Sequence, residues 1–295
     1  MAGEKKMKQH FFPHEKTQEM RPSAEPDPAI RGPFQTERKS SVPRLLLIPI
    51  LLYAVWVLET YLLEGSVGLF GQSQPLSFLL YTVFANCIVG TILPVMCLRS
   101  AFLSGAVNMF QAGFRSLQRT VLAFGLTALS GYLYLATFTP SGTPAVALFN
   151  TFMFIVPVAV AQVMICWVLI GTHVQAYLRK GRTAVSITFG VVVTAVLFGF
   201  SFAAHSPPLN QPDLLPLLCA IGAGAALFFF AVRDVYASVI FVACSTIPVV
   251  LQGIDPVFTS EFIPSVYGAA ALSLVCLTGC HLYLLRNFRT IRVPA

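Results

Sequence analysis

Charged residues are scarce in this chain: the 12 acidic and 19 basic side chains make up 11% of its 295 residues, whereas 56% are hydrophobic. Soluble domains carry roughly 25% charged residues, so this chain has less than half of the charge that ordinary solvation requires. The shortage excludes a water-soluble enzyme of this length. A mean hydropathy of +0.75 is typical of an integral membrane protein.

The sequence also lacks the motifs of several common classes of enzyme. It contains no GxxxxGK[ST] phosphate loop and no GxGxxG after a strand, so nucleotide binding is not expected. The serine hydrolase motif GxSxG and the zinc protease motif HExxH are absent as well. The 7 cysteines lie in apolar stretches without a CxxC pair, which predicts small buried side chains rather than a zinc or redox centre. The first 40 residues have no apolar core, so no cleavable signal peptide is expected.

Long apolar runs are what the chain has in abundance. A helix needs about 20 apolar residues to cross the hydrocarbon layer of a membrane. Eight such spans are predicted: 44–63, 76–98, 118–138, 146–178, 184–204, 214–232, 235–252 and 264–285. The predicted fold class is therefore all-α, a polytopic integral membrane protein of about eight transmembrane helices. The fourth run is overlong, which predicts a tilt, a kink near Pro157 or a projection into the cytoplasm.

The placement of charge predicts which way the spans run, because Lys and Arg in short loops stay in the cytoplasm. With eight spans and an inward N-terminus, all 19 basic residues fall on the cytoplasmic side. The predicted outer loops carry only acidic residues: Glu64, Asp213, Asp255 and Glu261. Both termini are therefore expected in the cytoplasm. The compact chain, without an organelle signal, is typical of a prokaryotic cell membrane.

Three parts of the chain follow from these boundaries. Residues 1–43 are polar, without an apolar period, and are predicted to be a disordered cytoplasmic tail. Residues 44–286 are predicted to form the eight-helix membrane domain. Residues 287–295 are predicted to be a basic cytoplasmic tail.

Polar side chains at membrane depth cost free energy, so each of them is a candidate functional group. Glu59, Glu64 and His205 all fall toward the outer face, which makes them the candidate catalytic residues, with His205 as a candidate metal ligand. Gln162 and His173 in the fourth run are candidates for a polar site within the membrane. The competing interpretation is structural: interfacial carboxylates and hydrogen-bonded histidines, without chemistry.

The stretch 162–248 resembles the core of the CPBP family of intramembrane proteases, which includes CAAX prenyl endopeptidases and bacteriocin-processing relatives. Val174–Lys180 is similar to the end of the family's EExxxR helix and its basic loop. Phe200–His205 is similar to the end of its FxxxH helix. Gly222–Thr246 is similar to its glycine-rich helix and its HxxxN helix. The resemblance implies a shared eight-span fold and, in active members, metal-dependent proteolysis.

Most of the family's catalytic positions carry other residues in this chain. Cys166 and Trp167 stand at the glutamate pair, Gly171 at the arginine, Val242 at the final histidine and Thr246 near the asparagine. His205 alone is retained. Because a metal-bound hydroxide needs several ligands and a general base, the resemblance does not by itself predict an active protease.

Three hypotheses follow. The first is a non-catalytic CPBP-like protein that binds a partner or a lipid in the membrane, without a cofactor. The second is an active intramembrane metalloprotease with divergent ligands, which needs zinc or another divalent metal. The third is a small-molecule transporter or a subunit of a membrane complex, for which prolines within spans supply helix breaks. Membrane lipids and another membrane protein are the expected partners; nucleic acids and nucleotides are not expected.

Overall fold

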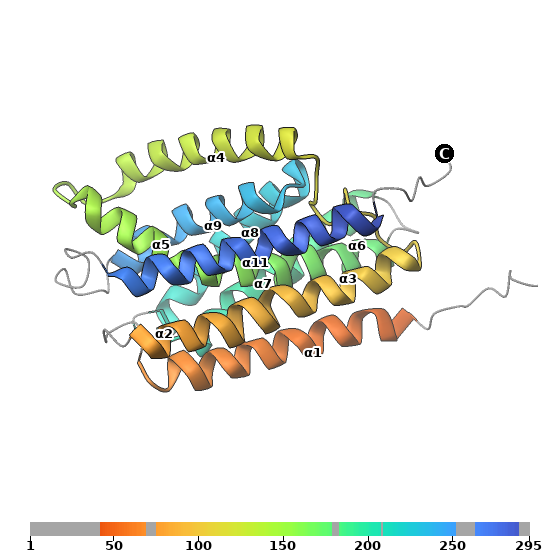
Figure 1. The fold of residues 1–295 in the computed structure, drawn as a ribbon, viewed down its shortest axis with the longest axis horizontal. Coiled ribbons are helices and arrows are strands. Elements are labelled where there is room, and N and C mark those ends of the chain that lie inside the picture. Colours follow the sequence, from red (N-terminus) through yellow and green to blue (C-terminus); the bar gives the residue numbers. More distant parts are fainter. Residues whose placement is uncertain (1–41, 69–74, 179–182, 208, 252–262, 289–295) are drawn as a thin grey trace, which may run out of the picture. The chain divides into compact units, whose positions relative to one another are not determined.

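The structure is a computed structural model that describes residues 42–68, 75–178, 183–207, 209–251 and 263–288. These residues belong to one compact unit, and all regular elements within them are helices (Figure 1). The first four apolar runs contain α1 (Val42–Thr60), η2 (Tyr61–Gly65), α2 (Pro75–Tyr81), η4 (Thr82–Ile92), α3 (Leu93–Leu103), α4 (Leu117–Phe138), α5 (Ala145–Gln162), η5 (Val163–Gly171) and α6 (Thr172–Leu178). The last four contain α7 (Thr183–Ser201), η6 (Phe202–Ala204), η7 (Pro212–Leu214), α8 (Leu215–Val232), α9 (Val235–Leu251) and α11 (Pro264–Phe288).

The helical runs confirm an all-α, multi-pass membrane fold. Within the described ranges, 7 runs are long and apolar enough to cross a membrane: Leu46–Gly65, Pro75–Leu103, Leu117–Phe138, Ala145–Leu178, Thr183–Ala204, Pro212–Val232 and Pro264–Phe288. The remaining predicted span corresponds to α9, which is apolar but only 17 residues long. The direction of the runs across the membrane stays a prediction from the charges.

Both predicted tails fall almost entirely outside the described residues. At the N-terminal end the description begins with Val42 and Pro43, which already belong to α1. At the C-terminal end α11 continues to Phe288, so the last helix extends slightly beyond the predicted span.

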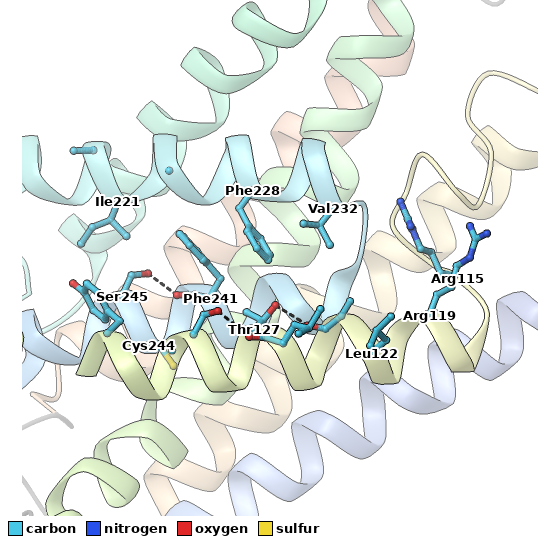
Figure 2. A pocket seen from close by; sticks show the side chains of 17 residues that line it. Arg115, Arg119, Leu122, Thr127, Ile221, Phe228, Val232, Phe241, Cys244 and Ser245 are labelled. Carbon is cyan, nitrogen blue, oxygen red and sulfur yellow. Dashed lines mark hydrogen bonds between the residues drawn. The ribbon is translucent and has the colours of Figure 1, made fainter. Parts of the chain in front are cut away.

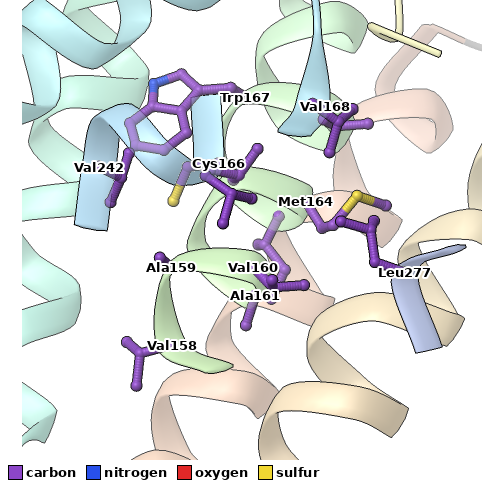
Figure 3. Close-up of a cluster of buried hydrophobic side chains, with 14 of the residues drawn as sticks. Val158, Ala159, Val160, Ala161, Met164, Cys166, Trp167, Val168, Val242 and Leu277 are labelled. Carbon is purple, nitrogen blue, oxygen red and sulfur yellow. The ribbon is translucent and has the colours of Figure 1, made fainter. Parts of the chain in front are cut away.

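The run α5–η5–α6 is the buried centre of the bundle, with 94% of its most apolar window inside the protein. It is apolar all round rather than on one face, and such a helix is stable only when other helices surround it. Figure 3 shows part of this core, with Met164 near Leu277 of α11 and Trp167 near Val242 of α9. Small residues allow those neighbours to approach closely: a Cβ on Gly90 would lie 2.4 Å from the Cβ of Ala161.

Three of the runs contain π-helical segments, namely η2, η4 and η5. In the fourth run the π-helix begins at Val163, six residues after Pro157, and the chain stays helical through both. A π-helix widens the backbone locally and rotates the side chains that follow it. The overlong fourth run therefore changes from α-helix to π-helix within the core, at Val163 rather than at Pro157.

α4 is the least buried of the long helices, with 6% of its most apolar window inside the protein. It lies at the edge of the bundle (Figure 1) and packs against α9. The contact is close at Gly131, where a Cβ would lie 2.6 Å from Cys244 Sγ. α9 also packs against α8, so α9 is the common neighbour of α4 and α8.

Candidate functional site

Glu64 and His205 meet where the first and fifth apolar runs end. Both side chains are fully buried, and His205 Nδ1 lies 2.9 Å from Glu64 Oε2. The Ser206 backbone N–H donates to both carboxylate oxygens at 3.1 Å, and the Ser206 hydroxyl donates to Oε1. The sequence placed Glu64 and His205 on the same side of the membrane, and the fold brings them into direct contact.

A glycine makes this junction sterically feasible. A Cβ on Gly65 would lie only 2.1 Å from the Ala204 carbonyl oxygen, so the backbones of η2 and η6 touch at this point. The carboxylate of Glu64 then bridges the two segments by bonding the residues that directly follow η6. This cluster of Glu64, His205 and Ser206 is called the carboxylate clamp below.

Further polar groups lie beside the carboxylate clamp. Tyr81 interacts electrostatically with Glu64, and its hydroxyl neighbours the side chains of Thr60 and Asn86. All three neighbours of the clamp are at most 1% exposed. The Tyr81 and Thr60 hydroxyls and both amide atoms of Asn86 lack a partner of good hydrogen-bond geometry. Sequence analysis missed Tyr81, Thr60, Asn86 and Ser206; the four-residue spacing of Thr60 and Glu64, which puts both on one helix face, was the available signal.

The other candidate residues do not join the clamp. Glu59 is partly exposed, and its buried Oε2 has no hydrogen-bond partner. Gln162 donates from Nε2 to Ser201 Oγ at 3.3 Å. His173 Nδ1 lies 2.7 Å from the carbonyl oxygen of Leu169, one turn earlier. Gln162 and His173 are eleven residues apart on one continuous helical run, on the order of 15 Å, so they do not form a common site.

The described residues do not fit the metal centre of the protease hypothesis. Zinc sites use three or four protein ligands, and the described ranges contain no group of three or more His, Cys, Asp or Glu side chains that could hold a metal ion. Both Glu64 oxygens already accept hydrogen bonds. Cys166, Trp167 and Val242, which the sequence resemblance aligns with catalytic positions of the family, belong to the apolar core drawn in Figure 3.

A cavity of about 830 Å³ lies between α4, α8 and α9 (Figure 2). Since α4 and α8 each pack on α9, α9 forms the floor of this groove and the other two helices form its walls. Its lining is mainly apolar or small, as in Leu122, Leu126, Ala220, Gly224, Phe228 and Phe241. The hydroxyls of Thr127, Ser130 and Ser245 line it too, but each donates to a carbonyl of its own helix. The groove therefore presents an apolar surface.

Two arginines stand at one end of the groove, at the start of α4 (Figure 2). Arg115 is held in place: its Nε donates to the Arg233 carbonyl oxygen at 2.8 Å, and its guanidinium lies 4.4 Å from the centre of the Phe110 ring. Arg119 follows four residues later and is exposed. From the sequence, both arginines served only to predict the orientation of the spans, and the groove was not predicted.

Arg233 anchors the loop that carries Arg115. It ends α8 in the left-handed region, with a φ of 53°. Its Nη1 donates to the Gln111 carbonyl oxygen at 2.8 Å, and its Nη2 donates to Gln175 Oε1. Burial, with a further contribution from the charge of Arg115, lowers the pKa of Arg233 to about 10, so Arg233 is still a cation at neutral pH.

Small residues of the 222–226 stretch have two different roles. Gly222 lets α8 approach α7 closely: a Cβ there would lie 2.7 Å from Phe198 Cδ1 on α7. Gly224 instead lines the groove, where a Cβ would have only ordinary contact with Phe241. The same run of small residues thus packs α8 on α7 and leaves space on the side of α4.

No protein-family model, curated protein or solved structure matches the chain. The resemblance to CPBP proteases accordingly stays a prediction from the sequence. The two structural features available for a functional proposal are the carboxylate clamp and the apolar groove.

Proposed function

We propose that this chain is a non-catalytic membrane protein that binds a lipid in the groove between α4, α8 and α9. The observation that carries the proposal is the groove itself: an apolar cavity of about 830 Å³ beside the least buried of the long helices. Ligand sites of small molecules typically measure about 300–1,000 Å³ and have mainly apolar linings. The groove has both properties.

The length of the groove suits an acyl chain. Its α4 wall runs from Arg119 to Tyr134, a separation of fifteen positions that corresponds to a rise of about 22 Å along the helix axis. One leaflet contributes half of a hydrocarbon layer of about 30 Å. An acyl chain of one leaflet can therefore lie along α4 with its headgroup at the arginine end.

The polar candidates favour a structural role over catalysis. Glu64 accepts hydrogen bonds from Ser206 and contacts His205. Gln162 and His173 are hydrogen-bonded to other groups. Catalysis by general acid and base groups needs them within reach of one reacting centre. A binding function needs only the shape and apolar lining of the groove.

The test is lipid retention by the purified full chain and by a variant whose groove is filled. Ala220 is exposed and lines the groove from α8, so Ala220→Trp inserts an indole into it. Ala271 is an exposed position on α11 that does not line the groove, and Ala271→Trp serves as the matched control. A phospholipid with a photoreactive acyl chain is crosslinked to the protein to map where the acyl chain binds.

We expect lipid to co-purify with the wild-type chain and with Ala271→Trp, and retention to fall about tenfold in Ala220→Trp, corresponding to about 1.4 kcal/mol. Photoadducts should map to α4, α8 and α9. Equal retention in the two tryptophan variants, or adducts spread evenly over all lipid-facing helices, would contradict a specific groove site.

A further inference from the structure

We infer that the lipid in the groove is an anionic phospholipid, whose phosphate is held by Arg115 and Arg119 at the start of α4. This inference rests on the proposed function and adds to it the chemical class of the ligand. The observation behind it is that Arg115 and Arg119 are the charged residues in a mainly apolar lining.

Arg115 lies two residues before α4 and Arg119 lies in its first turn. Both line the same end of the groove, where two like charges repel each other. Arg119 is exposed, and its guanidinium makes no hydrogen bond or ion pair within the part of the chain that the structure describes. An anion between Arg115 and Arg119 relieves the repulsion and supplies acceptors to both.

The surrounding charges leave this end of the groove positive. Arg233 adds a third cation, whose lowered pKa reflects the nearby charge of Arg115 in addition to burial. Asp234 is the acidic residue of this region, but its carboxylate accepts from the Thr120 hydroxyl at 2.9 Å and from the Ala237 backbone N–H at 3.0 Å. The aspartate thus caps α9 and leaves an excess of positive charge among the described residues.

The guanidinium group matches a phosphate in geometry and charge. Its planar set of donors binds phosphate oxygens in pairs, and these charge-assisted hydrogen bonds are stronger than neutral ones. Arg115 is already oriented by the Arg233 carbonyl and the Phe110 ring, so little side-chain freedom is lost on binding. A zwitterionic headgroup would bring its own cation toward the two arginines that line the groove.

The predicted topology places this headgroup in a suitable leaflet. The positive-inside pattern puts Arg115 and Arg119 on the cytoplasmic side, where anionic lipids accumulate. A phospholipid of the inner leaflet can enter the groove between α4 and α8 without moving its headgroup through the hydrocarbon.

The experiment compares the affinities of three probes for the full chain in detergent by native mass spectrometry: phosphatidylglycerol, phosphatidylcholine and oleate, with matched oleoyl chains. Arg119→Gln removes one charge at the groove. Arg99→Gln removes an exposed charge on α3 away from it and is the matched control. Unchanged thermal transitions show that both variants are folded.

We expect the wild-type chain and Arg99→Gln to bind phosphatidylglycerol about tenfold more tightly than phosphatidylcholine. Both lipids carry the phosphate, but phosphatidylcholine also brings a quaternary ammonium toward the arginines, and that cation is repelled. In Arg119→Gln this preference should fall to about threefold or less, because the affinity for phosphatidylglycerol falls more than the affinity for phosphatidylcholine. Equal affinity of the wild-type chain for the two phospholipids, or an undiminished preference in Arg119→Gln, would overturn the inference. Tighter binding of oleate than of phosphatidylglycerol would overturn the assignment to a phosphate.

The groove-filling variant separates this inference from the proposed function. If Ala220→Trp loses both phospholipids while the wild-type chain does not discriminate between them, the headgroup assignment fails and lipid binding in the groove stands. If Ala220→Trp binds both as the wild type does, lipid binding in the groove fails, and the headgroup assignment fails with it.

Discussion

Replacement of Glu64 removes the acceptor that joins the end of the first apolar run to the end of the fifth. Its carboxylate accepts two hydrogen bonds from the Ser206 backbone, a third from the Ser206 hydroxyl, and contacts His205 at 2.9 Å, with Glu64 and His205 side chains fully buried. Removal of this acceptor leaves the buried Ser206 N–H and hydroxyl unsatisfied and His205 without its contact; each such group costs about 1–3 kcal/mol, together about 3–5 kcal/mol. We expect Glu64→Ala to lower the free energy of unfolding by this amount.

The isosteric variant makes the expectation sharper. Glu64→Gln keeps the shape and one acceptor oxygen but loses the charge, and hydrogen bonds to charged groups contribute about 1.5–3 kcal/mol. The expected loss is about 2 kcal/mol, close to one such bond. Glu59→Gln is the matched control, because Glu59 lies on the same helical run, is partly exposed and makes no hydrogen bond to the clamp among the described residues. Its effect should stay within about 0.5 kcal/mol.

Reversible unfolding in mixed micelles, followed by circular dichroism, measures these differences. A double-mutant cycle with Ser206→Ala should give a coupling free energy of about 1–2 kcal/mol between Glu64 and Ser206. Wild-type stability in Glu64→Gln together with zero coupling would refute the clamp. That result would favour a catalytic role for Glu64 over a structural one, because a buried carboxylate that does not stabilise the fold needs another explanation.

Two further predictions test the junction and the orientation. Gly65→Ala should lower the free energy of unfolding by about 1–3 kcal/mol, because its Cβ would overlap the Ala204 carbonyl oxygen. Gly125→Ala, whose Cβ meets open space in α4, should be neutral or raise it by up to about 1 kcal/mol; equal effects in thermal denaturation would contradict the close approach. For the orientation, cysteines introduced at the exposed Ser116 and Gln211 should differ in intact cells, with a membrane-impermeant maleimide labelling only Gln211→Cys. Labelling of Ser116→Cys alone would reverse the predicted topology.

The sequence pointed to two of the three clamp residues and missed the third. Glu64 and His205 were recognisable because an ionisable residue among apolar neighbours is conspicuous in a membrane segment. Ser206 was not, because a serine next to a proline-rich loop is ordinary, and its bonding to Glu64 joins residues 142 positions apart. Grouping Glu59 with Glu64 followed from their shared depth, but depth alone does not decide the direction in which a side chain points.

The sequence by itself determined the all-α membrane fold, because the number of apolar residues in a run and the polar breaks between runs are local properties. It also predicted the orientation, which depends on counts of charge. Only the tertiary structure decided that α4 and α8 stand apart over α9, with Arg115 and Arg119 at the end of the space between them. Lipid-facing and protein-facing sides of these helices are equally apolar, so no hydrophobic pattern records which side meets a neighbour and which side leaves a groove.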